Sequence, residues 1–158
     1  MRQSVVPLPG GRLRWSKLPT AMPPTEAYHQ LSFYTLAHPD RERFLHQHAV
    51  DAYTAQTAGA DTKPIGLLYA LVGLYLTVER GYTGREVQRA HLLLARDKSD
   101  FPPLPIPNDR GSVTVSDVLC HPAGEERDAA ILDWCASVWG AYKSCHATVA
   151  DYCQRRQV

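Results

Sequence analysis

The chain has 158 residues, 44% of them hydrophobic and 21% charged, and its 17 lysines and arginines nearly balance its 16 aspartates and glutamates. This length suits one domain of ordinary size, and the apolar share is too high for a disordered chain. The basic residues form no dense block, so we expect neither a nucleic-acid nor an anionic-membrane partner.

Residues 1–22 form an N-terminal arm that lacks the apolar core of a signal peptide. Prolines after it mark helix starts, because a proline inside a helix removes a donor and clashes with the preceding turn. Gly81 suits a left-handed helix end, and Thr83 with Glu86 matches a capping box that opens the next helix. The first four predicted helices cover residues 24–37, 39–57, 64–80 and 84–98.

The third of these helices carries the longest apolar run of the chain, residues 65–78. This run is shorter than the ~20 residues that a membrane span needs, so we expect a buried central helix and no membrane partner. Gly66 and Gly73 lie on nearly one face of it and would let a neighbouring helix approach closely.

The second half of the chain opens with a proline cluster in residues 99–111, which predicts a stiff, extended crossing segment. A short helix over 114–120 and a long helix over 125–155 follow. In the long helix, apolar residues recur at spacings of four and three and form one stripe. We predict an all-α fold, an up-down bundle of four to five main helices in which residues 23–158 form a single domain.

The four cysteines all lie in the C-terminal third of the chain and include no Cys-x-x-Cys pair. Cys135 and Cys153 would lie ~27 Å apart along one helix, whereas a disulfide holds two Cα atoms within ~7 Å. We therefore expect reduced thiols that pack as small apolar groups in a cytoplasmic protein.

Histidines are the strongest candidates for chemistry, and the chain has seven. Short loops make sequential helices antiparallel, so residues equidistant from a loop lie at the same height. Counting from each loop places His29, His48 and His91 near one level, each on a face shared with apolar residues. Neutral imidazoles that converge in an apolar core are suitable ligands for zinc or iron, and Asp51 and His146 form a second tier of the site.

Each of these candidates can also be interpreted as a residue with a purely structural role. A single histidine on an apolar face is more often a packed core residue than a ligand, and no His-x-x-x-His pair fixes two ligands on one helix. Tyr53 and Tyr69 would line the same interior, where packing is the commoner role of a tyrosine, and Gln56 is a further polar candidate for a pocket. Trp134 and Trp139 indicate either core or an interface.

Three functions remain open on this evidence. The first is a metal-dependent hydrolase or transferase, in which a metal-bound water would react at the three histidines. The second is a non-catalytic, homodimeric interaction module anchored by Trp134, Trp139 and Phe101. The third is a metal-free protein that binds a small-molecule ligand in a pocket lined by tyrosine and histidine.

Several segments also carry a resemblance: residues 28–31, the run His-Gln-His-Ala-Val-Asp-Ala-Tyr-Thr-Ala-Gln at 46–56, residues 63–65, 79–87 and 134–139. They are similar to a bacterial family of unknown function. The resemblance implies a compact, mostly helical protein and supplies no activity. Members of that family often carry an N-terminal cysteine pair and a histidine after the glutamine that matches Gln56, whereas this chain has Cys120 as its first cysteine and Thr57 at that place. A more distant likeness, in bundle shape, links the chain to the four-helix DinB-like metal enzymes.

Overall fold

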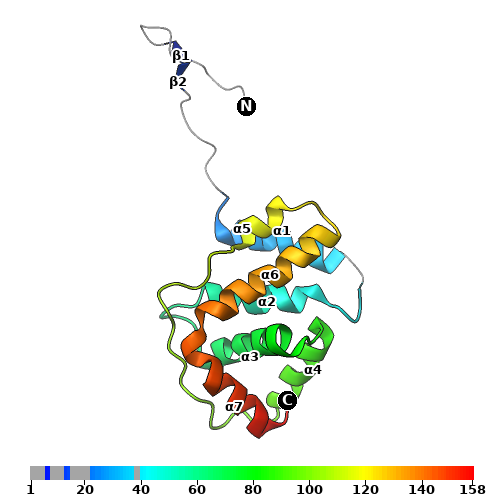
Figure 1. The fold of residues 1–158 in the computed structure, drawn as a ribbon, viewed down its shortest axis with the longest axis vertical. Helices are drawn as coiled ribbons and strands as arrows, with labels where there is room; N and C mark the ends of the chain where they lie inside the picture. Colours follow the sequence, from blue (N-terminus) through cyan, green and yellow to red (C-terminus); the bar gives the residue numbers. More distant parts are fainter. Residues whose placement is uncertain (1–5, 8–12, 15–21, 38–39) are drawn as a thin grey trace.

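The computed structural model describes residues 6–7, 13–14, 22–37 and 40–158, and these residues are helical over most of their length (Figure 1). Two two-residue strands, β1 (Val6–Pro7) and β2 (Leu13–Arg14), pair antiparallel within the arm. The all-α class is confirmed for the described residues, which contain seven α-helices rather than four to five main ones. They are α1 (Pro24–Ala37), α2 (Leu45–Gln56), α3 (Pro64–Arg80), α4 (Gly84–Leu94), α5 (Val115–Cys120), α6 (Glu125–Ala141) and α7 (His146–Arg156).

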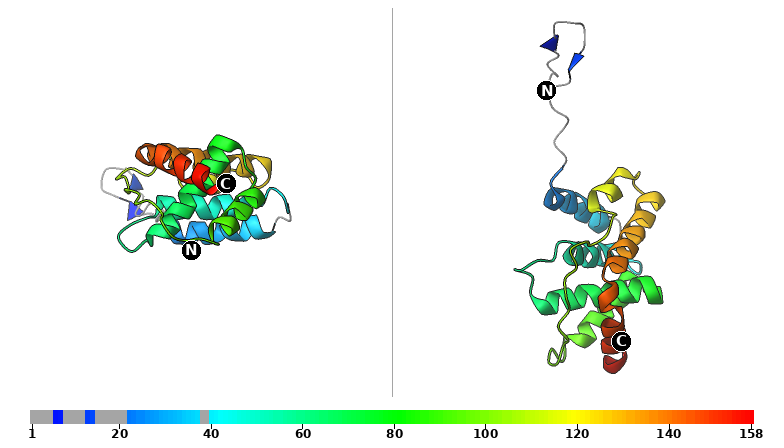
Figure 2. Two further views of the ribbon diagram at one scale, coloured as in Figure 1. Left: turned by 90° about the horizontal axis from the view of Figure 1, so that it is seen from below. Right: turned by 60° about the vertical axis from the view of Figure 1, so that its left-hand side comes forward.

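The centre of the structure is formed by α2, α3 and α6, each of which packs on the other two. Outside this centre, α1 contacts α2 and α5, α4 covers α2 and α3, and α7 packs on α3. Figures 1 and 2 show α6 and α7 running along one side of the stack made by α1, α2 and α3. One apolar cluster contains side chains from every helix, so the helices before and after residues 99–111 share a core.

The central helix α3 begins and ends where its sequence predicts. Pro64 is its first residue, and Gly81 follows its last residue with a φ of 69°, in the left-handed region that glycine adopts readily. The Thr83–Glu86 capping box at the start of α4 is also present. Among the described residues, no helix combines the length and the apolar character needed to span a bilayer.

Two predicted helix boundaries are wrong. Helix α2 begins at Leu45 rather than at residue 39, because Phe44 has a φ of 39° and cannot continue a right-handed helix. Before it, the Asp40 side chain accepts a hydrogen bond from the backbone of Arg43 at 2.9 Å and holds a separate turn. Helix α4 ends at Leu94, whereas the pattern predicts residue 98.

The single long helix predicted over 125–155 is also wrong, because the chain breaks between α6 and α7 in a 3₁₀ turn, Lys143–Cys145. The carbonyl oxygen of Trp139 accepts a bond from the backbone N–H of Tyr142 and another, at 2.8 Å, from the ring of His146. These two bonds occupy the Trp139 carbonyl, which in a regular α-helix would accept the backbone N–H four residues further on, and the helix ends here. The predicted apolar stripe still faces the core on both sides of the break.

The cysteines are free thiols, three of them buried and Cys120 exposed. The two glycines of α3 differ in their surroundings. A Cβ atom on Gly73 would overlap the carboxyl group of Asp51 in α2, whereas a Cβ atom on Gly66 would have no neighbour within 4 Å. The predicted close approach of a neighbouring helix is confirmed at Gly73 only.

The contact at Gly73 gives a test of this packing. Gly73→Ala should lower the free energy of unfolding by about 1–3 kcal/mol, because the added methyl group forces Asp51 or the α2 backbone to move. Gly66→Ala is the matched control on the same helix, and it should leave stability unchanged or raise it by up to about 1 kcal/mol through helix propensity. Urea denaturation measures both variants, and equal stabilities would contradict the close contact.

Candidate functional site

The three histidines predicted to share one level do not converge. His29 is exposed on α1, His48 is buried on α2, and His91 is half-buried on α4, where its Nε2 lies 2.9 Å from the carbonyl oxygen of Tyr69. In the part of the chain that the structure describes, no group of three or more His, Cys, Asp or Glu side chains is placed to hold a metal ion.

The reason for the difference lies in the face of α1 that points outward. His29 shares this face with Phe33 and Leu36, as predicted, but Phe33 is 79% exposed and Leu36 61% exposed. The apolar residues that turn α1 toward the core are instead Ala27 and Leu31. The apolar spacing therefore identified a real stripe of α1, but the prediction that this stripe faces the core is wrong, because it faces solvent.

His48 is the candidate whose surroundings support a function. Its Nδ1 lies 3.0 Å from the hydroxyl of Thr77 in α3, and that hydroxyl donates its only proton to the carbonyl of Gly73 at 2.8 Å. The imidazole must then carry its proton on Nδ1 and donate it to Thr77. This leaves Nε2 with a lone pair that can accept a hydrogen bond or bind a metal.

A cavity of about 200 Å³ opens beside this ring, where five segments meet. The turn before α2, the start of α2, the C-terminal end of α3, the link between α3 and α4, and α6 all contribute to its wall. Its lining residues are Arg43, Leu45, His48, Thr77, Gly81, Tyr82, Thr83 and Leu132.

Backbone contacts fix the wall of this cavity. The carbonyl of Arg43 accepts the N–H of Gly84 at 2.7 Å, and the carbonyl of Glu42 accepts the N–H of Arg85 at 3.3 Å, so the turn before α2 serves the first amides of α4. A side chain at Gly84 would collide with the Arg43 and Phe44 carbonyls, so only glycine allows this approach. The guanidinium of Arg85 lies 4.2 Å above the Phe44 ring and closes the same corner.

Electrostatics keep the ring of His48 neutral. Burial, with a smaller contribution from the guanidinium of Arg43, lowers the pKa of His48 to about 4. Arg43 itself lies 3.4 Å from Asp128 and 3.7 Å from Asp40, and it is half exposed, so these ion pairs hold it weakly. The cavity thus offers one neutral acceptor and one cation that a ligand can recruit.

Asp51 lies one turn from His48 on α2 but outside this cavity. It is only 3% exposed, its Oδ1 accepts a bond from Gln47 at 3.1 Å, and its Oδ2 has no hydrogen-bond partner among the described residues. Burial raises the pKa of this carboxyl well above its usual range, against a smaller lowering by Gln47. Cys135 of α6 is equally buried, and its thiol, whose pKa burial and Asp51 both raise, lies 3.6 Å from the carbonyl of His48.

Gln56 fills a structural role. Its amide donates to the carbonyls of Arg110 and Val113 at 3.3 and 2.8 Å and accepts a bond from the indole of Trp134 at 2.9 Å. This network ties the proline-rich segment to α2 and α6, and it leaves Gln56 away from the His48 cavity.

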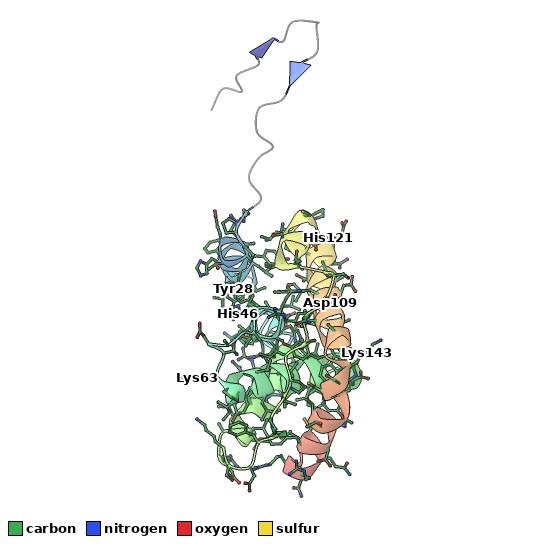
Figure 3. The ribbon with its side chains drawn as sticks, turned by 90° about the vertical axis from the view of Figure 1, so that its left-hand side faces the viewer. Tyr28, His46, Lys63, Asp109, His121 and Lys143 are labelled. Atoms are coloured by element: carbon green, nitrogen blue, oxygen red, sulfur yellow. The ribbon has the colours of Figure 1, made fainter. Side chains whose placement is uncertain are left out.

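The aromatic candidates are paired with other rings. Tyr53 stacks on Tyr28 at 3.9 Å between ring centroids. Nδ1 of His46 on α2 lies 2.9 Å from the hydroxyl of Thr35 on α1, and Figure 3 labels both Tyr28 and His46. These two contacts join α1 to α2.

Farther along the fold, Tyr69 stacks on His91, and His146 stacks on Trp139 at 4.0 Å. None of these four rings lines the cavity at His48. Burial raises the pKa of the Tyr69 phenol, whose oxygen has no hydrogen-bond partner among the described residues.

A family of unknown function, DUF5946, matches residues 25–143, which is most of the chain. The chain belongs to this family. No curated protein and no solved structure matches it, so the likeness to DinB-like bundles rests on the sequence pattern alone. The matched DUF5946 region contains every residue that lines the cavity at His48.

Of the residues that line this cavity, the sequence predicted only His48 as a site residue, and it missed the four other polar ones: Arg43, Thr77, Tyr82 and Thr83. One signal was available, because Thr77 is a polar residue in a helix that is otherwise apolar on every side. The position of Arg43 depends on the left-handed Phe44, which no pattern in the sequence predicts.

The lowered pKa of His48 predicts a loss of stability in acid. Between pH 6.5 and about 4 the unfolded chain binds a proton at this residue and the folded chain does not, so folding is favoured less as the pH falls. Relative to His48→Gln, the wild type should lose about 3 kcal/mol between pH 7 and pH 4. Urea denaturation across this range measures the difference, with the exposed His121→Gln as control, and parallel curves for wild type and His48→Gln would refute it.

The raised pKa of Asp51 predicts the opposite slope. Because the folded chain holds this proton to higher pH than the unfolded chain, stability falls as the pH rises from about 3.8 toward the folded pKa, by at most about 1.4 kcal/mol per pH unit. Asp51→Asn removes the titration, so the variant should gain on the wild type as the pH rises. Exposed Asp133→Asn is the control, and a constant offset for Asp51→Asn would show that the carboxyl is charged when folded.

Proposed function

We propose that this DUF5946 protein binds a small polar molecule, without a metal, in the cavity beside His48. The observation that carries the proposal is a buried imidazole, held in one tautomer by Thr77, that lines a cavity with a cation at its rim. Binding sites typically place a few polar groups of fixed orientation in a largely apolar cleft, and this cavity has that composition.

The groups in the wall define the class of ligand. Nε2 of His48 is an acceptor, so the ligand presents a hydroxyl or N–H to it. Arg43 favours a carboxylate or another acceptor on the far side of the same molecule. Leu45 and Leu132 supply apolar wall. The volume, about 200 Å³, is below the ~300 Å³ at which pockets for drug-sized ligands begin, so the ligand is correspondingly small.

This proposal takes the third of the three functions left open by the sequence. A hydrolase or transferase with zinc or iron would need further ligands beside His48, and the nearest carboxyl on the same helix, Asp51, faces Gly73 instead. The homodimer proposal loses two of its anchors, because Trp134 and Trp139 are core residues with 0% and 2% exposure. A cytoplasmic location remains part of the proposal.

Ligand-observed NMR on the full-length protein tests it. Small hydroxy acids such as glycolate and lactate serve as probes, and acetate, which lacks the hydroxyl donor, is the matched control compound. We expect the hydroxy acids to bind the wild type more tightly than acetate does and to lose affinity in His48→Leu, because leucine has no atom that accepts a hydrogen bond.

Exposed His29→Leu is the matched control variant and should bind as the wild type does. Probe signals that respond equally in wild type and His48→Leu would refute the cavity as the site. Saturable zinc binding that depends on His48 would instead favour the metal-dependent enzyme.

A further inference from the structure

A second and larger cavity, an open groove of about 640 Å³, lies between α1 and the α5–α6 corner and shares no lining residue with the His48 cavity. Phe33 lines this groove and is 79% exposed, and Leu36, three residues further along α1, is 61% exposed. Residues three apart on a helix are neighbours on its surface. Large apolar side chains exposed together in this way commonly mark a surface on which another molecule packs.

Acidic side chains lie toward both ends of this groove. Glu26 lines it near the start of α1. Toward the other end, the hydroxyl of Tyr34 in the groove wall accepts the N–H of Gly124 at 2.9 Å. This bond brings the first turn of α6, with the exposed Glu125 and Glu126, next to the wall. The groove together with these three glutamates is called the acidic groove below.

One basic residue, Arg127, also lines the acidic groove, but the protein itself already engages it. Its guanidinium lies 4.7 Å from the centre of the Tyr34 ring and donates hydrogen bonds to the carbonyls of Leu119 and His121. The acidic groove therefore suits an occupant that places apolar side chains against Phe33 and a cation toward each end.

The chain carries a surface of this kind on α4 and the turn that follows it. Four exposed residues share one face there because they stand at helical spacing, and they are called the basic face below: Arg89, Leu92, Leu93 and Arg96. Leu92 is 69% exposed and Leu93 47%. Arg89 contacts Glu42 at 3.5 Å, but these side chains are 62% and 61% exposed, so the ion pair is weak and Arg89 can exchange it for another partner.

We propose that copies of this chain associate head to tail, with the basic face of one copy seated in the acidic groove of the next. The leucines would pack against Phe33, and the two arginines would lie near the glutamates at the two ends of the groove. The spacings agree: Glu26 and Tyr34 are ~12 Å apart along α1, and the two arginines are ~10 Å apart along α4. This proposal uses none of the residues that line the His48 cavity.

The positions of the two surfaces determine what kind of assembly forms. Figure 1 shows α1 near one end of the helical part of the molecule and α4 toward the other, so the two surfaces of one copy can serve two different neighbours. A contact between two different surfaces is heterologous, and it continues from copy to copy as a ring or a chain. We therefore expect association to proceed past the dimer.

Sedimentation velocity of the full-length protein over a wide range of concentrations tests the proposal. The wild type should exceed the mass of a dimer at high concentration, and high salt should weaken the association several-fold by screening the charges. Phe33→Ser and Leu92→Ser should each remain monomeric. An equimolar mixture of these two variants should form a heterodimer and stop there, because one variant keeps the basic face and the other keeps the acidic groove. Both side chains are exposed, and circular dichroism checks that both variants fold.

Ile106→Ser is the matched control, because Ile106 is an exposed apolar residue that belongs to neither surface, and it should associate as the wild type does. A wild type that stays monomeric at every concentration would overturn the proposal and leave the groove to a different partner. Dimers formed by Phe33→Ser or by Leu92→Ser alone would also overturn it, because the contact would then join two identical surfaces. A mixture of the two variants that stays monomeric would overturn it as well.

Discussion

Two polar side chains of α2, His48 and Asp51, are buried against α3 in an otherwise apolar interface, and α3 meets each with a residue suited to it. Because they are three residues apart, they lie on one face of α2. On α3, Thr77 supplies an oxygen that accepts the His48 proton, and Gly73, one turn earlier, leaves room for the Asp51 carboxyl. Replacing Thr77 would leave the buried His48 ring without its partner, and adding a side chain at Gly73 would overlap Asp51. Each change would lower the free energy of unfolding by on the order of 1–3 kcal/mol.

The same contact positions the cavity. With α2 held against the C-terminal half of α3, the turn that precedes α2 lies at the first amides of α4 and serves them as hydrogen-bond acceptors. Backbone hydrogen bonds between segments distant in sequence therefore hold this part of the wall, which is a rigid arrangement for binding. His48 can be almost completely buried and still face a ligand, because among the described residues only Nδ1 of its ring has a hydrogen-bond partner.

The sequence predicts those parts of the fold that depend on local chemistry. Pro64, Gly81 and the Thr83–Glu86 box act within a few residues of themselves, and the structure confirms each of them. Local chemistry does not predict the helix break after Ala141, because this break depends on the ring of His146 bonding to the Trp139 carbonyl, which a regular helix would use.

The candidate site was predictable only in part, for a similar reason. Burial separates His48 from His29, and burial depends on which stripe of each helix faces its neighbours. Periodicity identifies the stripes but does not decide between an inward and an outward apolar face, as Phe33 shows. The contact between His48 and Thr77 of α3 and the turn at Phe44 both depend on tertiary structure. The sequence therefore predicts His48 as a site residue but does not predict its cavity.

Nitrogen-15 NMR of the His48 ring, recorded from pH 7 to pH 4, tests this account most directly. The account predicts a neutral ring with its proton on Nδ1, unchanged until the pH approaches about 4. A ring that titrates near pH 6.5, or one that carries its proton on Nε2, would contradict both the bond to Thr77 and the free acceptor on which the proposed binding depends.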